Sequence, residues 1–261
     1  MKLKKMKRTK IAMMMIVLLA LSLIACSKTS QVTFEIKADY GVLEGEKTVV
    51  LENHNGDPAN VYTRTTDTNT VTFIDFPYGT YTVRIRQAGF TEYTYPSLEV
   101  KSARIAHEAT LLPDVGKIIQ FADREWRILE RQGNRALVIS QRTIGERRFD
   151  ANSNVWENSE IRRYLNGEFY DTFSDVDKAK ISEHTTGDKV FLLSFEEARQ
   201  YFSSDRDRVA SDSSGAASFW WLRSPGLITS FASRVDGDGD IHLGGNRVLS
   251  GGIRPALWLN L

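Results

Sequence analysis

Alternation of apolar and polar residues in short runs is the feature that most limits what the first half of this chain can form. Successive side chains of a strand point to opposite faces of a sheet, so this alternation is typical of a strand buried on one side. Turn residues such as Pro77-Tyr78-Gly79 separate the runs. The clearest apolar positions are Val32, Phe34, Ile36, Tyr81, Val83 and Ile85. The pattern predicts an all-β sandwich domain over residues 32–112.

The pattern changes after Pro113-Asp114-Val115-Gly116, which we interpret as a junction. Strand-like runs then alternate with helical patterns. An apolar stripe at helical spacing runs from Ile161 to Phe173. Ser194 and Glu197 match a capping box that opens a helix extending to Phe202. A polar loop is expected over residues 203–218, followed by strands at 219–222, 231–235 and 255–259. We therefore predict a second domain of the α+β class over residues 113–261.

The N-terminus carries six basic residues, then an apolar run over residues 11–21, then Leu23-Ile24-Ala25-Cys26. This is the anatomy of an export signal. The last four residues resemble the lipobox of bacterial lipoproteins, in which the cysteine thiol is lipidated and the cysteine becomes the new N-terminus after cleavage. The resemblance implies a signal peptide over residues 1–25, a palmitate-type lipid on Cys26 and a polar tether over residues 26–31. The protein would then lie on the extracytoplasmic face of the cell membrane.

An uncleaved single-span anchor is the alternative reading of this segment. The apolar run is shorter than the roughly 20 residues that a membrane span needs. Under either reading the rest of the chain is exported and tethered to a membrane, which makes the membrane its first partner.

Cysteine content and charge exclude several classes of protein. Cys26 is the single cysteine, so a disulfide-stapled fold and a thiolate metal site are excluded. Six of the 34 Lys and Arg residues precede residue 11, and the remaining 28 face 33 Asp and Glu residues, which gives a formal charge of −5. A mildly acidic mature chain lacks the basic excess of a nucleic-acid binder, so no nucleic-acid partner is expected.

Two stretches of the first domain carry a family resemblance. They are the run from Phe76 to Val83 and the pair Gly89-Phe90. Both resemble the prealbumin-like sandwich repeats of bacterial surface proteins, including the collagen-adhesin B-type and carboxypeptidase-regulatory-like domains. The resemblance implies a β-sandwich, and we expect this domain to act as a stalk.

Several phrases of the second domain resemble a single bacterial family of unknown function, DUF6273. The phrases begin at Trp156, Tyr164, Asp188, Trp220 and Gly252. This resemblance implies export and brings no activity with it. The order of elements also looks like the C-type-lectin fold, and the final Gly-Ile-Arg-Pro-Ala strand resembles the formylglycine-generating-enzyme group. That enzyme group uses cysteines that this domain lacks, so its catalytic role is not carried over.

Trp221, Arg223 and Arg254 are the candidate ligand-binding residues. Trp220 and Trp221 occupy adjacent strand positions and face opposite sides, so at most one of them forms a platform for sugar rings. Burial of both in the core is the alternative. Each arginine ends an apolar strand and needs an acidic partner, which is either an internal carboxylate or an anionic or hydroxylated ligand.

Asp236, Asp238 and Asp240 alternate with glycines, a spacing at which carboxylates converge on calcium. An ordinary hairpin turn explains the same residues. The four histidines are scattered and form no zinc pair, and no nucleophile elbow or phosphate loop is present. The sequence therefore gives no positive catalytic signal, and calcium is the one cofactor that it raises.

We therefore predict a membrane-anchored, non-enzymatic cell-envelope lipoprotein that displays a binding module for a glycan or an envelope protein. Its ligand-facing surface is expected at residues 220–226 and 236–246. One alternative is an envelope-acting enzyme that uses carboxylates such as Asp236, Asp238 or Glu157. The other is a purely structural surface protein.

Overall fold

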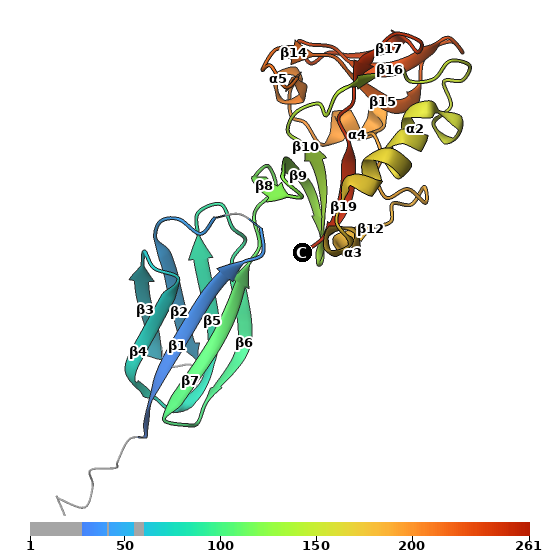
Figure 1. Cartoon of the computed structure of the whole chain (residues 1–261). Helices are drawn as coiled ribbons and strands as arrows, with labels where there is room; N and C mark the ends of the chain where they lie inside the picture. Colours follow the sequence, from blue (N-terminus) through green and yellow to red (C-terminus); the bar gives the residue numbers. More distant parts are fainter. Residues whose placement is uncertain (1–27, 41, 55–59) are drawn as a thin grey trace, which may run out of the picture. The chain divides into compact units, whose positions relative to one another are not determined.

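The computed structural model describes residues 28–40, 42–54 and 60–261 (Figure 1). Contacts between Cα atoms divide the chain into two compact units. The N-terminal unit holds the described residues up to Lys37, with Glu44–Ala88 and Glu92–Thr110. The C-terminal unit holds Leu111–Leu261, with Ala38–Leu43 and Gly89–Thr91. Both units are built mainly of β-strands in several sheets.

The described part of the N-terminal unit forms two sheets, ordered β4-β1-β7 and β3-β2-β5-β6. The strands are β1 (Thr29–Ala38), β2 (Lys47–Asn53), β3 (Val61–Thr66), β4 (Thr70–Pro77), β5 (Gly79–Gln87), β6 (Tyr93–Val100) and β7 (Arg104–Leu111). Phe76 of the first sheet packs against Tyr62 and Tyr81 of the second, with ring centroids 4.6 and 4.8 Å apart. The predicted all-β character of this half is confirmed.

The alternating residues of this unit form its core. Val32, Phe34 and Ile36 of β1 are buried, and the polar residues between them are exposed or half-buried. Tyr81, Val83 and Ile85 of β5 are buried in the same way. Burial of these apolar faces supplies the main stabilising free energy, about 25 cal/mol per Å² removed from water.

The described part of the C-terminal unit contains two larger sheets, ordered β12-β19-β10-β9-β8 and β11-β18-β15-β16-β17, and a small β13-β14 pair. The strands of the first sheet are β8 (Ile118–Phe121), β9 (Arg124–Gln132), β10 (Arg135–Ser140), β12 (Ile181–Ser182) and β19 (Ala256–Asn260). The others are β11 (Glu146–Arg147), β13 (Ala210–Ser211), β14 (Ala217–Ser218), β15 (Trp220–Pro225), β16 (Phe231–Val235), β17 (Ile241–Asn246) and β18 (Gly251–Gly252).

Short helices connect these sheets. They are η2 (Trp156–Asn158), α2 (Glu160–Tyr164), η3 (Leu165–Phe169), η4 (Tyr170–Thr172), α3 (Asp175–Lys180), α4 (Phe195–Gln200) and α5 (Asp205–Arg208). The capping box is confirmed, because the Ser194 side chain accepts from the Glu197 backbone while the Glu197 side chain accepts from the Ser194 backbone. The loop expected over residues 203–218 is wrong in part, since it includes α5, β13 and β14.

The predicted stripe from Ile161 to Phe173 is helical, but the helix changes type along it. Ile161, Leu165, Phe169 and Phe173 are all buried and lie four residues apart. In an α-helix such a stripe drifts by about 40° at each step, because a turn holds 3.6 residues. The π-helical segment η3 is more loosely wound and counteracts this drift, which keeps the four side chains facing the core.

Candidate functional site

The structure places both neighbouring tryptophans in the core. Trp221 is 0% exposed, and its indole N–H donates to the carbonyl oxygen of Arg147 over 2.9 Å. Trp220 is equally buried and donates to the carbonyl oxygen of Arg208. β18 approaches so closely that a Cβ atom on Gly251 would lie 2.7 Å from the Trp221 ring. The prediction of Trp221 as a sugar platform is therefore wrong, because the side chain is fully buried, with Gly245 of β17 and Gly251 of β18 close to its ring.

Arg223 has an internal acidic partner. It forms a bidentate ion pair with Glu197 of α4, in which Nη2 lies 2.6 Å from Oε1, and it also donates to the carbonyl oxygen of Leu192. Burial raises the pKa of Glu197, but the hydrogen bonds and charge of Arg223 outweigh this and hold the pKa below its usual range. The structural ion pair, rather than a ligand, accounts for Arg223.

Arg254 is 1% exposed and makes no ion pair in the described part of the chain. Its Nε donates to the Ser140 carbonyl oxygen over 2.9 Å, and its Nη1 donates to the Arg208 carbonyl oxygen over 3.1 Å. The guanidinium also lies against the rings of Phe202 and Trp220. Burial, with the nearby charge of Arg127, lowers the pKa of Arg254. Direct ligand binding by Arg254 is therefore wrong, because surrounding atoms enclose its side chain.

The Asp236–Asp240 segment is a hairpin turn between β16 and β17. The Asp236 amide donates to the Asp240 carbonyl oxygen over 2.8 Å. The Asp236 carboxylate pairs with Arg234 at 2.8 Å and lies 3.1 Å from His242. Asp236, Asp238 and Asp240 do not gather as a ligand set, and residues 28–40, 42–54 and 60–261 hold no cluster of three His, Cys, Asp or Glu side chains suited to a metal ion. The hairpin reading accounts for the Asp-Gly repeat.

Two of the phrases that resemble the family of unknown function, those beginning at Trp156 and Asp188, meet at one buried carboxylate. Asp188 is 2% exposed. It accepts hydrogen bonds from Trp156 Nε1 at 2.8 Å, Arg162 Nε at 2.7 Å and Thr186 Oγ1 at 2.9 Å. A buried carboxylate is stable only when such donors compensate for lost hydration. These phrases therefore encode an internal polar network that holds helix α2 against the 183–190 loop.

The same network extends to His184 and could be mistaken for a catalytic triad. Thr186 Oγ1 lies 2.9 Å from both His184 Nδ1 and Asp188 Oδ2. The His184 ring stacks on Phe191 with centroids 4.1 Å apart, and Nε2 lies 4.0 Å from Glu197. The hydroxyl sits between the histidine and the carboxylate, whereas a nucleophile must lie beyond the histidine. The arrangement is that of a structural network.

Stability of the C-terminal unit is expected to fall when the pH is lowered from 7 to 5. Burial, followed by the charge of Arg223, lowers the pKa of His184, although Glu197 and Asp188 act in the opposite direction. The unfolded chain therefore binds the proton more readily, and the stabilisation present above the unfolded pKa of about 6.5 is lost as the pH falls towards the folded pKa.

Thermal unfolding followed by tryptophan fluorescence isolates this effect, because all five tryptophans lie in the C-terminal unit. The His184→Gln variant should show a shallower decline of Tm with acidification. If Tm falls equally steeply with pH in the wild type and the variant, groups other than His184 cause the pH dependence.

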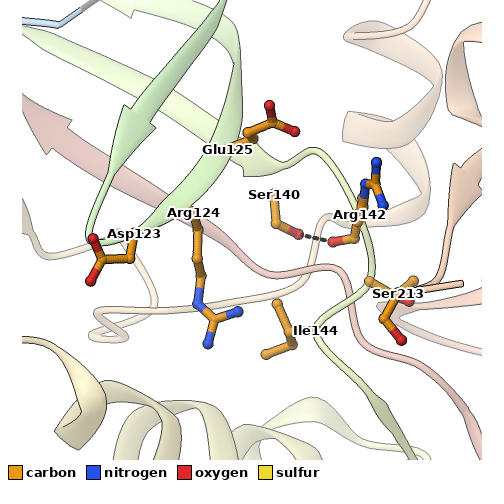
Figure 2. A pocket seen from close by; sticks show the side chains of 8 residues that line it. Asp123, Arg124, Glu125, Ser140, Arg142, Ile144 and Ser213 are labelled. Atoms are coloured by element: carbon orange, nitrogen blue, oxygen red, sulfur yellow. Dashed lines mark hydrogen bonds between the residues drawn. The ribbon is translucent and has the colours of Figure 1, made fainter. Parts of the chain in front are cut away.

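A surface cleft of about 350 Å³ brings together three segments that are far apart in the sequence. Asp123 comes from the β8–β9 turn, Arg124 and Glu125 begin β9, and Ser213 comes from the β13–β14 connection. Ser140 ends β10, and the segment after it contributes Arg142, Thr143 and Ile144. Figure 2 shows Asp123 and Arg124 on one side of the cleft and Arg142 and Ser213 on the other.

The charged side chains of this cleft lack internal partners. Asp123, Glu125 and Arg142 make no side-chain hydrogen bond or ion pair with another described residue, and Arg124 only lies over the Phe169 ring at 5.5 Å. Thr143 is 7% exposed, and its hydroxyl also has no partner among the residues of the described ranges. Groups of both charges and a free hydroxyl therefore face a ligand-sized space.

The cleft has a rigid frame. The Ser140 hydroxyl donates to the Arg142 carbonyl oxygen over 2.7 Å, as drawn in Figure 2, while buried Arg254 donates to the Ser140 carbonyl oxygen. On the other side, the turn holds Ala122 and Asp123 at φ values of +48° and +58°, a left-handed conformation unusual for residues other than glycine. Strain of this kind often marks functional sites.

None of the residues that line this cleft is among the candidate site residues predicted from the sequence. A signal was present in the three consecutive charged residues at positions 123–125 of a tight hairpin. The loops named in advance, 220–226 and 236–246, do not line the cleft.

Cys26 lies outside the residues that the structure describes. Within the described ranges, no helix has the length and apolar character needed to cross a membrane.

Residues 133–261 match the family model described as "Domain of unknown function (DUF6273)", which confirms the predicted resemblance over that range. No curated protein matches the chain. Similar solved structures include two type II cohesin–X–dockerin complexes from Acetivibrio cellulolyticus, with 18% and 19% identity, 33% and 40% of this chain covered, and TM-scores of 0.26 and 0.24. A protein from Bacteroides uniformis described as carbohydrate-binding has 16% identity, 46% of this chain covered and a TM-score of 0.28. The chain spans 59%, 62% and 59% of these structures, respectively.

Proposed function

We propose that this chain is a lipid-anchored binding protein of the cell envelope that holds a hydroxylated ligand, such as a glycan, in the cleft of its C-terminal unit. The observation that carries the proposal is the group of unpartnered charged side chains around that cleft. These side chains are exposed and therefore free to contact a ligand, whereas the charges of Asp188 and Glu197 are satisfied internally.

The chemistry of the lining fits sugar hydroxyls. Carboxylates of Asp123 and Glu125 accept from hydroxyl groups, and the guanidinium groups of Arg124 and Arg142 donate to them. Ile144 adds an apolar contact for the carbon face of a ring. The volume of about 350 Å³ lies within the range of about 300–1,000 Å³ that small-molecule sites occupy.

Substitution of the cleft residues should weaken glycan binding. Glycan-array screening of the full chain would identify a bound glycan, and calorimetry would then compare variants. We expect Glu125→Gln and Arg142→Ala each to weaken binding about tenfold, since each removes a charge-assisted hydrogen bond. Both side chains are exposed, so the Tm should remain unchanged.

Arg206→Ala is the matched control, because Arg206 is equally exposed and does not line the cleft. An equal loss of glycan affinity in all three variants would overturn glycan binding at the cleft. So would a wild-type chain that binds no glycan. The enzymatic alternative would use Asp123 and Glu125 as an acid–base pair. It requires that new reducing ends accumulate when the bound glycan is incubated with the chain, and we expect none.

We also propose that the N-terminal unit acts as a stalk, that the boundary between independently folding domains lies near Pro113, and that Cys26 carries the lipid.

The lipobox resemblance and the absence of any other cysteine support the anchor. Cys26→Ala should move the protein from the membrane fraction to the soluble extracytoplasmic fraction. Retention of the variant with an unchanged N-terminus would contradict lipidation and favour the uncleaved anchor.

A further inference from the structure

A second cavity of the C-terminal unit, about 380 Å³ in volume, shares no lining residue with the cleft described above. Its walls come from α4, from α5 with the segment before it, and from the start of β17. The residues that matter for its chemistry are Phe195, Arg199, Phe202, Asp205, Arg208 and Ile241.

Arg208 presents its guanidinium group at this cavity, and contacts with neighbouring residues fix the position of that group. It is only 9% exposed; its Nε donates to the Gly239 carbonyl oxygen over 2.8 Å, and its Nη2 pairs with Asp205. Its Nη1 makes no hydrogen bond with any residue of the described ranges. Nη1 therefore keeps free N–H groups that are able to donate to an acceptor in the cavity.

Arg199 provides a second cation on the same cavity. It lies one helical turn after Phe195, and its guanidinium sits 5.7 Å from the centroid of that ring. No carboxylate among the described residues pairs with it. Asp205, the carboxylate of the lining, is already paired with Arg208. The cavity therefore carries excess positive charge and favours an anion.

The remaining wall is apolar. Phe202 is buried, whereas Phe195 and Ile241 are half-buried and face the cavity. A fully hydrated inorganic anion would gain nothing from these side chains, but an organic anion would bury its carbon skeleton against them.

We propose that this cavity binds a small organic monocarboxylate. Its carboxylate accepts hydrogen bonds from Arg199 and from Nη1 of Arg208, and its apolar part lies against Phe195 and Ile241. This site is independent of the proposed glycan cleft, because none of these four residues lines that cleft.

The test uses 4-fluorobenzoate as the probe and 4-fluorobenzamide as its neutral match, with binding to the full chain followed by fluorine NMR titration. We expect saturable binding of the benzoate and binding of the amide that is about tenfold weaker or worse, because the amide lacks the charge that the arginines recognise. Equal binding of the two probes, or no saturable binding of the benzoate, would overturn the proposal.

Variants then locate the site. Arg199→Gln should weaken benzoate binding about tenfold, and its exposed position protects the fold. Arg206→Gln, on the adjacent helix and outside the cavity, should bind like the wild type. Arg142→Ala should also bind benzoate normally, which separates this site from the glycan cleft. Wild-type affinity in Arg199→Gln, or loss in Arg142→Ala, would place the benzoate elsewhere and contradict the assignment.

Discussion

Asp188→Asn is expected to lower the free energy of unfolding of the C-terminal unit by about 3 kcal/mol, since it removes the charge of a buried carboxylate that accepts three hydrogen bonds. The carboxylate accepts from Trp156, Arg162 and Thr186, and an asparagine amide presents one oxygen in place of two. Urea unfolding followed by tryptophan fluorescence measures the change, and the variant should also alter the emission of Trp156.

Asp171→Asn is the matched control for this prediction. Its carboxylate also pairs with a basic side chain, Lys178 at 3.3 Å, but it is exposed to solvent. Exposed pairs contribute about 0–1 kcal/mol, so the control should unfold almost as the wild type does. Similar curves for Asp188→Asn and Asp171→Asn would show that the buried network contributes no more than a surface pair.

Gly239→Ala should destabilise the same unit by about 3 kcal/mol or more, since it combines backbone strain with a steric clash. Gly239 has φ +97°, and a Cβ atom there would lie 1.8 Å from the Asp205 carbonyl oxygen. The clash is with the backbone, so the turn and α5 have to separate, and the contact of Arg208 with the Gly239 carbonyl oxygen would be lost.

Gly237→Ala tests the same turn without the clash. The nearest atom to a Cβ at Gly237 is 3.8 Å away, and the residue has an ordinary φ. We expect its unfolding curve to lie close to that of the wild type. If both variants are equally stable, the close approach of Gly239 to Asp205 does not exist in solution.

Local features of the chain could be predicted from the sequence because neighbouring residues decide them. The alternation in β1 and β5 identifies the buried face of each strand, and the Ser194–Glu197 capping box involves atoms only three residues apart. The helical stripe is similar, although the π segment depends on its packing against the core.

Burial and the choice of partner were not predictable in this way. An apolar or basic residue at a strand end is compatible with either a ligand or an internal partner. Arg223 and its partner Glu197 are 26 residues apart in the sequence, and Arg254 and its partner Ser140 are 114 residues apart. Trp221 is covered because Gly251 of β18 permits close approach of a strand that begins 30 residues later.

The sequence by itself therefore determined the strands, the turns, the capped helix and the family resemblance of residues 133–261, since these depend on local periodicity and on ordered phrases. The tertiary structure decided which charged groups remain unpaired. Asp123, Arg142 and Ser213 form one cleft only because the β8–β9 turn, the segment after β10 and the β13–β14 connection converge. That convergence results from the packing of two sheets, and no interaction between neighbours in the chain specifies it.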